Sequence, residues 1–92
     1  MRFKFDKRKS QLIKGNPNRG IDFEEAQELW NRPYYLDQRS DFPEQYRAIG
    51  WVKGHLCSVI FEVRQDEKGD FYYLVTLWRS TREEQKLYEK NI

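Results

Sequence analysis

Hydrophobic and polar residues alternate at the start of this chain. Within residues 2–5, two phenylalanines alternate with two basic residues, and this spacing of two predicts a half-buried β-strand. Asp6 then offers a side-chain oxygen that can cap a helix, which we expect to run to Ile13. Residues 15–20 contain glycine, asparagine and proline, which favour turns and end the helix.

Apolar residues at helical spacing indicate a second helix. Asp22 and Glu25 have the spacing of a capping box, which marks a helix start. The apolar positions recur three or four residues apart: Phe23, Ala26, Leu29 and Trp30. Pro33 ends this helix because proline lacks the backbone N–H that a helix needs. We expect residues 34–36 to begin an extended edge segment, followed by a polar loop at 37–43.

Three further segments have the patterns of β-strands. Residues 45–52 alternate, residues 56–63 form a β-branched run typical of a central strand, and residues 71–78 form the third segment. Lys53-Gly54 supplies the first turn and the polar stretch at 65–70 supplies the second. These segments predict an antiparallel β meander of three strands.

The C-terminal segment begins with two overlapping capping boxes. Ser80 and Thr81 each stand three residues before a glutamate, so we expect a helix to start near the second of them. Leu87 and Tyr88 would lie on its inner side. The predicted fold class is α+β: an N-terminal strand and two helices, the three-stranded meander and a C-terminal helix, all in a single domain of residues 1–92.

The composition indicates a folded protein with one core. Charged residues make up 35% of the 92 residues, but fifteen aromatic residues compensate, because each buried ring removes about 150–250 Å² from water. The one cysteine, Cys57, cannot form an internal disulfide, and we expect it to be a small core residue. The chain has neither an apolar run of membrane-spanning length nor a signal-peptide pattern, so we expect a cytoplasmic protein without membrane contact.

The net charge of +2 hides a segregation of charge along the chain. Residues 1–20 contain seven basic residues and one acidic residue, which gives +6, whereas residues 21–92 carry −4. A basic segment of this kind favours a polyanion or an acidic partner. A solvated basic face without a ligand is the alternative.

Few residues are suited to metal or cofactor chemistry. One histidine, one cysteine and scattered carboxylates do not make the clustered ligands that zinc or magnesium requires. Gly50 and Gly54 stand in a predicted hairpin and not in a phosphate-binding loop between a strand and a helix. We therefore expect no metal and no cofactor. His55, the one histidine, is of the residue type that titrates near neutrality, and it is either an exposed structural residue or a catalytic one.

Arginines and a carboxylate near strand ends suggest phosphate chemistry. RNA carries its own nucleophile in the 2′-OH, so its cleavage needs in-line positioning, a proton acceptor, a proton donor and cations, but no metal. Arg79 and Arg82 lie where the last strand meets the last helix, and backbone N–H groups there add to an anion site. Glu44 and Arg47 begin the first meander strand and can face them across the sheet. Surface ion pairs of little energetic value are the alternative.

Several short blocks occur in an order and spacing that are characteristic when taken together: Phe5-Asp6 with Lys9, Gly20-Ile21-Asp22-Phe23-Glu24-Glu25-Ala26, Pro33, Glu44 with Tyr46, Ile49 and Gly50, Leu74-Val75-Thr76, Arg79-Ser80-Thr81-Arg82, and Leu87-Tyr88-Glu89. In these blocks the chain resembles the BrnT toxins of bacterial type II toxin–antitoxin pairs, which are ribonucleases with a RelE-like fold. The resemblance spans nearly the whole chain.

The chain departs from that family at basic positions. Arg19 stands where the family usually has a histidine, and Gln45 stands where it often has an arginine. Tyr73 and Trp78 replace two further arginines of the last strand. An aromatic residue can stack on an RNA base at about 1–3 kcal/mol, so Trp78 can exchange a charge contact for stacking. Losing positioned cations can also abolish cleavage and leave a binding module for an antitoxin or a nucleic acid.

The resemblance implies a metal-independent ribonuclease toxin. Arg79 would stabilise the phosphorane, Glu44 would accept the 2′-OH proton, and Tyr88 would orient or donate a proton. The expected site residues are the catalytic Arg79, Glu44, Arg47 and Tyr88 and the RNA-binding Lys7, Lys9, Lys14, Arg19, Arg82 and Trp78. The implied partners are RNA and a cognate antitoxin, a BrnA-like ribbon-helix-helix DNA-binding protein.

Overall fold

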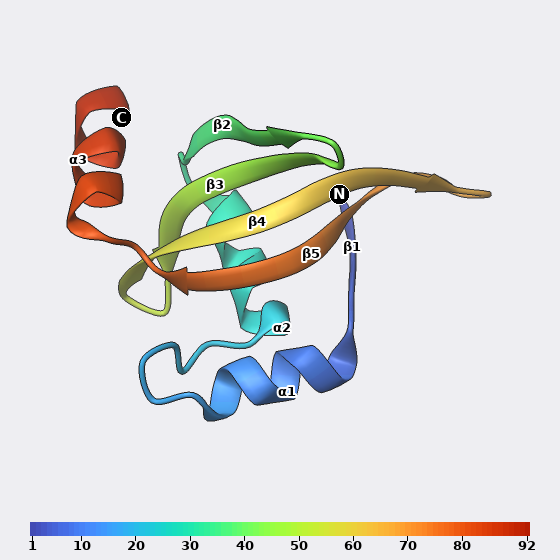
Figure 1. The fold of residues 1–92 in the computed structure, drawn as a ribbon, viewed down its shortest axis with the longest axis horizontal. Coiled ribbons are helices and arrows are strands. Elements are labelled where there is room, and N and C mark those ends of the chain that lie inside the picture. Colours follow the sequence, from blue (N-terminus) through green and yellow to red (C-terminus); the bar gives the residue numbers. More distant parts are fainter.

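A twisted five-stranded mixed sheet forms the centre of the structure, a computed structural model that describes all residues from 1 to 92 (Figure 1). The strands, in chain order, are β1 (Arg2–Phe5), β2 (Tyr35–Asp41), β3 (Glu44–Val52), β4 (His55–Asp66) and β5 (Gly69–Arg79). The helical elements are α1 (Lys7–Gly15), α2 (Phe23–Ala26), the 3₁₀ helix η1 (Gln27–Asn31) and α3 (Arg82–Asn91). The predicted α+β class is confirmed.

The sheet is larger than the predicted three-stranded meander. Its strand order is β1-β5-β4-β3-β2, with β1 parallel to β5 and the other pairs antiparallel. The loop predicted at 37–43 is wrong, because β2 continues to Asp41. The start of β2, Tyr35 and Leu36, falls in the predicted edge segment, but the rest of the strand is polar. Its pairing with β3 and an ion pair between Asp37 and Arg47 stabilise it. Its polar residues gave no strand pattern, so the sequence did not predict this part of the strand.

The polar stretch at 65–70 is likewise mostly strand. β4 and β5 stay paired until Asp66 lies opposite Gly69, which leaves a turn of two residues. None of the helices is long and apolar enough to span a membrane.

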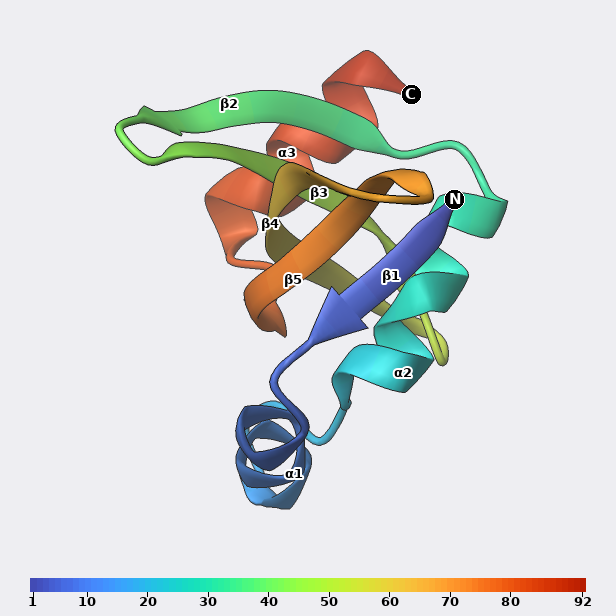
Figure 2. The same ribbon diagram turned by 90° about the vertical axis from the view of Figure 1, so that its right-hand side faces the viewer.

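One face of the sheet carries the main core, covered by α1, α2 and η1 (Figure 2). Its fully buried members come from both layers: Phe23, Ala26, Leu29, Ala48, Val52, Val59 and Leu77. Gly50 lets η1 approach β3 closely, because a Cβ at this position would lie 2.8 Å from Leu29 Cγ. Cys57 is buried in this core, as predicted.

The opposite face of the sheet carries α3, which both ribbon views place away from α1 and α2 (Figures 1 and 2). Ile49 and Ile60 are buried on this face. The helix starts as one of the two predicted capping boxes requires, with Thr81 and Glu84 bonded reciprocally. The other predicted box does not form, because the Ser80 hydroxyl instead bonds Ser58 Oγ at 2.9 Å.

Candidate functional site

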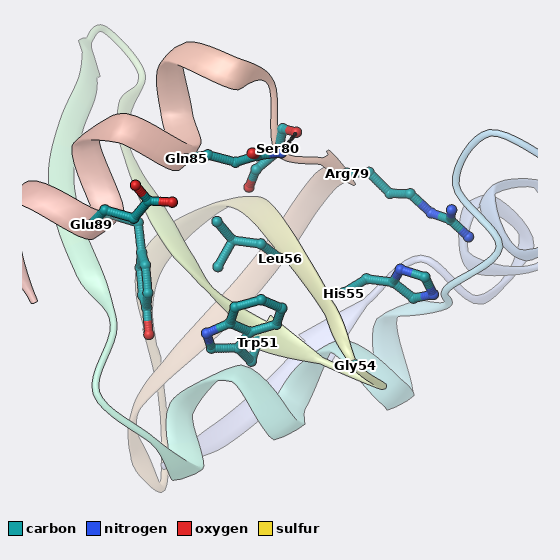
Figure 3. Close-up of a pocket in the computed structure, with 9 residues that line it drawn as sticks. Trp51, Gly54, His55, Leu56, Arg79, Ser80, Gln85 and Glu89 are labelled. Atoms are coloured by element: carbon teal, nitrogen blue, oxygen red, sulfur yellow. Dashed lines mark hydrogen bonds between the residues drawn. The ribbon is translucent and has the colours of Figure 1, made fainter.

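A pocket opens at the end of the sheet, between the β3–β4 hairpin and the junction of β5 with α3 (Figure 3). Its volume is about 350 Å³. The lining residues come from the hairpin, the junction and one face of α3: Trp51, Gly54, His55, Leu56, Arg79, Ser80, Gln85, Tyr88 and Glu89. The pocket combines a cation, a histidine, a phenol, a carboxylate and an indole.

The β5–α3 junction holds Arg79 in place. Ser80 N–H donates to Leu56 O at 2.9 Å, and the Ser58–Ser80 hydroxyl contact ties the same junction to β4. The Arg79 Nε donates to Arg19 O at 3.3 Å. Gly20 makes this approach possible: its φ is +67°, and a Cβ there would lie 3.5 Å from Arg79 Nη2.

The charge of Arg79 has no carboxylate partner. The ion pairs of the chain involve other cations, namely Arg2, Lys4, Lys14, Arg47 and Arg64. An arginine without a carboxylate beside it can hold a phosphate in the bidentate geometry that its guanidinium favours. Arg79 is therefore available for an anionic ligand at the mouth of the pocket.

His55 is the first residue of β4 and lies on the same side of the pocket as Arg79 (Figure 3). Its side chain is exposed and has no hydrogen-bond partner in the chain. Histidine is the residue type that both accepts and donates protons near neutral pH. The sequence left open whether His55 is a structural or a catalytic residue. Its exposed imidazole lies on the same side of the pocket as the unpaired guanidinium of Arg79, which favours a catalytic role.

Helix α3 forms the wall opposite Arg79. Gln85, Tyr88 and Glu89 are three and four residues apart, so they share one face of the helix. The Tyr88 ring packs edge-on against Trp51, with ring centroids 6.3 Å apart and an interplanar angle of 89°. Tyr88 lines the pocket, and its OH donates a long hydrogen bond to Pro33 O at 3.4 Å.

A buried ion network fastens α3 to the sheet. Glu84, whose side chain is 6% exposed, accepts hydrogen bonds from Thr81 N–H at 2.8 Å and Trp78 Nε1 at 2.9 Å. Its other oxygen contacts Arg47 Nη1 at 3.3 Å, and Arg47 also pairs with Asp37. Burial alone would raise the pKa of Glu84, but these hydrogen bonds lower it below its usual value. The network positions the face of α3 that lines the pocket.

Two of the predicted catalytic residues meet in the pocket, Arg79 and Tyr88. Glu44 does not. Gly50 of β3 pairs with Cys57 of β4, which in turn pairs with Arg79 of β5. Glu44 lies six residues before Gly50 on β3, so about 20 Å of strand separates Glu44 from Arg79. Its carboxylate instead accepts a hydrogen bond from Tyr46 OH, which raises the pKa of Tyr46. The hypothesis that Glu44 faces Arg79 across the sheet is therefore wrong.

Arg47 is also outside the pocket. Its guanidinium donates to both carboxylate oxygens of Asp37, at 3.0 and 2.5 Å, and to Glu84. These bonds raise the pKa of Arg47, the hydrogen bond to Asp37 having the largest effect. Two carboxylates neutralise this cation, so it is a structural residue and the prediction of a catalytic role is not supported by its placement.

The predicted RNA-binding residues are dispersed. Arg19 adjoins the pocket through its contact with Arg79, and Arg82 is exposed at the first turn of α3. Trp78 faces the α3 side of the sheet, where it bonds Glu84 and carries the Arg39 guanidinium 5.2 Å above its ring. Trp78 therefore does not line the pocket.

The basic N-terminal segment is partly neutralised by the rest of the chain. Arg2 and Lys4 both pair with Asp66, and Lys14 pairs with Glu25 at 2.6 Å. The other predicted contacts of this segment, Lys7 and Lys9, are exposed on α1 without ion pairs. The positive charge that remains free lies on α1 and in the loop that leads to Gly20.

Cys57 is not a nucleophile at neutral pH. Burial raises the pKa of its thiol to about 11, although Arg79 nearby opposes the shift.

Apart from Arg79, Tyr88 and His55, the sequence reasoning assigned none of the pocket residues to a site: it missed Trp51, Gly54, Leu56, Ser80, Gln85 and Glu89. The helical spacing of Gln85 and Glu89 with Tyr88 was a usable signal, since it places all three on one face of the last helix. Trp51 had no comparable signal, because an aromatic residue beside a hairpin turn is common.

The chain matches no protein-family model and no curated protein sequence.

Proposed function

We propose that this protein binds RNA at the pocket and cleaves it without a metal ion. The observation that carries the proposal is an unpaired arginine, Arg79, beside an exposed histidine, His55, at one side of a pocket that Tyr88 also lines. Those groups supply what cleavage by an internal 2′-OH needs: a cation for the phosphate and two side chains for proton transfer.

The residues divide the reaction between them. The 2′-OH gives its proton to His55 Nε2 or Nδ1 and attacks the adjacent phosphorus, while Arg79 donates hydrogen bonds to the non-bridging oxygens as their negative charge grows. The P–O5′ bond breaks, and the leaving oxygen takes a proton from Tyr88 OH or from water. The products are a 2′,3′-cyclic phosphate and a free 5′-OH. His55 replaces Glu44 as the proton acceptor of the sequence hypothesis.

The biological role that we propose is that of a BrnT-like toxin of a type II toxin–antitoxin pair. The sequence blocks that resemble the family support it, and so does a fold with an N-terminal strand and helices, an antiparallel sheet and a closing helix. In this role the free cations Lys7, Lys9 and Arg19 would meet RNA or an acidic segment of a BrnA-like antitoxin.

A binding module without cleavage is the second candidate. Arg47 is neutralised by two carboxylates, and Tyr73 and Trp78 stand where the resemblance implies arginines. A site with a single free arginine can retain RNA while it stabilises the transition state poorly. The same experiment separates the two candidates.

The test is inducible expression in a bacterium, with cellular RNA examined after induction. We expect the wild-type protein to arrest growth and fragment RNA, and Arg79→Ala to relieve both effects. Lys68→Ala removes a positive charge from the β4–β5 turn at the other end of the sheet and should behave like the wild type. Normal growth with intact RNA in cells that contain folded wild-type protein would contradict the nuclease proposal and leave the binding module.

A further inference from the structure

The apolar part of the pocket has no role in the proposed cleavage step. Trp51 and Leu56 form this part, beside the position of Arg79 and His55 (Figure 3). Trp51 is 38% exposed, although burial of the whole indole would be favourable. Its ring is nearly perpendicular to that of Tyr88, and Trp51 also lines the pocket. An exposed aromatic surface of this kind next to a phosphate site is suited to stacking a nucleobase.

One polar side chain near this part, Glu89, has no partner within the chain. Among the lining side chains, Arg79 bonds Arg19 O, Ser80 bonds Ser58, Gln85 bonds Ser80 O and Tyr88 bonds Pro33 O. The Glu89 carboxylate has neither a hydrogen bond nor an ion pair, and Figure 3 places it on α3 above Trp51. It therefore offers two free acceptor oxygens to a ligand of the pocket that Trp51 also lines.

We propose that Trp51 and Glu89 form a subsite that selects guanine next to the cleaved phosphate. This inference rests on the proposed function, because it names the base that the RNA presents at the same pocket. Guanine is the one common RNA base with two adjacent donors, N1–H and N2–H, on its pairing edge. A carboxylate can accept both, whereas adenine and cytosine each pair one donor with an acceptor that a carboxylate repels. Uracil has a single donor between two acceptors.

One nucleotide would contact both parts of the pocket, with its base at Trp51 and its phosphate at Arg79. The base would lie against Trp51 with its donor edge toward α3, and the phosphate would face Arg79 across the pocket. Gln85 stands one helical turn before Glu89 on the same face of α3, so its amide borders the same edge of the base. The site is therefore built from the β3–β4 hairpin and the capped helix α3.

The test uses fluorescein-labelled 2′-fluoro RNA pentamers of uridine with one central base, because 2′-fluoro sugars remove the nucleophile and prevent cleavage. Fluorescence anisotropy gives the Kd for central guanine, inosine and adenine. We expect guanine to bind about tenfold tighter than adenine, since a good two-bond contact to a base edge discriminates by about one decade. Inosine lacks the N2 amine and should fall between them.

Substitutions of Glu89 and Trp51 test whether these residues cause the preference for guanine. Glu89→Gln should bring the guanine and adenine Kd values within twofold of each other, because its amide nitrogen no longer accepts a hydrogen bond. Glu83→Gln lies in the first turn of the same helix, outside the pocket, and should keep the preference. Trp51→Ala should weaken binding of every pentamer several-fold, and Trp51→Phe should restore most of it by stacking.

The outcomes separate this inference from the function on which it rests. Equal Kd values for guanine and adenine in the wild-type protein, or a guanine preference that survives in Glu89→Gln, overturn the guanine subsite and leave RNA binding intact. Failure of the folded wild-type protein to bind any pentamer, together with failure to cleave RNA, overturns both. A preference that is lost in Glu89→Gln and kept in Glu83→Gln supports the guanine subsite and RNA binding at the pocket.

Discussion

Replacing Glu84 with glutamine tests whether the buried ion network holds α3 against the sheet, and with it one wall of the pocket. One Glu84 oxygen accepts from Thr81 N–H and Trp78 Nε1, and the other contacts Arg47. Glutamine has the same size and keeps one acceptor oxygen. Its amide nitrogen would face the Arg47 guanidinium, so a charge-assisted contact is replaced by two opposed donors.

The size of the effect follows from what Arg47 retains. Hydrogen bonds to charged groups contribute about 1.5–3 kcal/mol, and removing one partner of a buried pair leaves the other without compensation. Arg47 keeps both bonds to Asp37, so the loss is at the lower end. We expect Glu84→Gln to lower the free energy of unfolding by about 1–2 kcal/mol, which corresponds to roughly 4–16 °C in Tm for a domain of this size.

Urea unfolding followed by circular dichroism measures this change, with Glu83→Gln as the matched control. Glu83 is exposed in the same helical turn and carries the same charge, so its loss should change the free energy by no more than about 0.5 kcal/mol. If both variants unfold at the same urea concentration at pH 7, the network does not hold α3 and the reasoning is refuted.

The pH dependence gives a second readout. The pKa of Glu84 is lowered in the folded protein, so its carboxylate stabilises the fold above the unfolded value of about 4.3, and that contribution is lost as pH falls through the folded pKa. The difference between wild type and Glu84→Gln should be constant near neutrality and should shrink below about pH 4.

Two other substitutions test the fold. Gly50→Ala should destabilise the protein by about 1–3 kcal/mol in urea unfolding, because the new methyl group would overlap Leu29; an unchanged midpoint would mean that η1 can shift freely. Asp66→Asn tests how stability depends on pH in acid. Hydrogen bonds from the Arg2 guanidinium and then from Lys4 hold the pKa of Asp66 well below its usual range. Asp66 therefore stabilises the fold above about pH 4, and this effect is lost as pH falls. The variant should show a flatter dependence of the unfolding midpoint between pH 2 and 7, and an identical dependence would contradict the ion pair.

Local chemistry predicted most of the helices and the central strands. The helix starts were predictable because a capping side chain acts within one turn of its own helix. Asp6, Asp22 and Thr81 each cap a helix as expected. The start of the edge strand β2 was predicted from residues 34–36, but its continuation through residues 37–41 was not. Its stability comes from β3 and from the contact of Asp37 with Arg47, partners that lie outside its own sequence.

The site was predictable only where neighbours in sequence are neighbours in space. Arg79 was found because the end of a strand beside a helix start is a local feature, and Tyr88 because it lies on the inner face of that helix. The distance from Glu44 to Arg79 depends on the register of three strands, which residue patterns do not specify. The pairing of Arg47 with Glu84 likewise depends on where α3 settles on the sheet.

Cleavage of RNA by the purified protein tests the central claim most directly. A 5′-labelled RNA is incubated with protein in excess EDTA, and the product ends are identified. We predict fragments with 2′,3′-cyclic phosphates from the wild type and from Lys68→Ala, and a rate at least about 100-fold lower for Arg79→Ala, the cost of removing one positioned donor from a transition state. The absence of cleavage by the wild-type protein, or an unchanged rate for Arg79→Ala, would contradict the assignment of the pocket as a ribonuclease site.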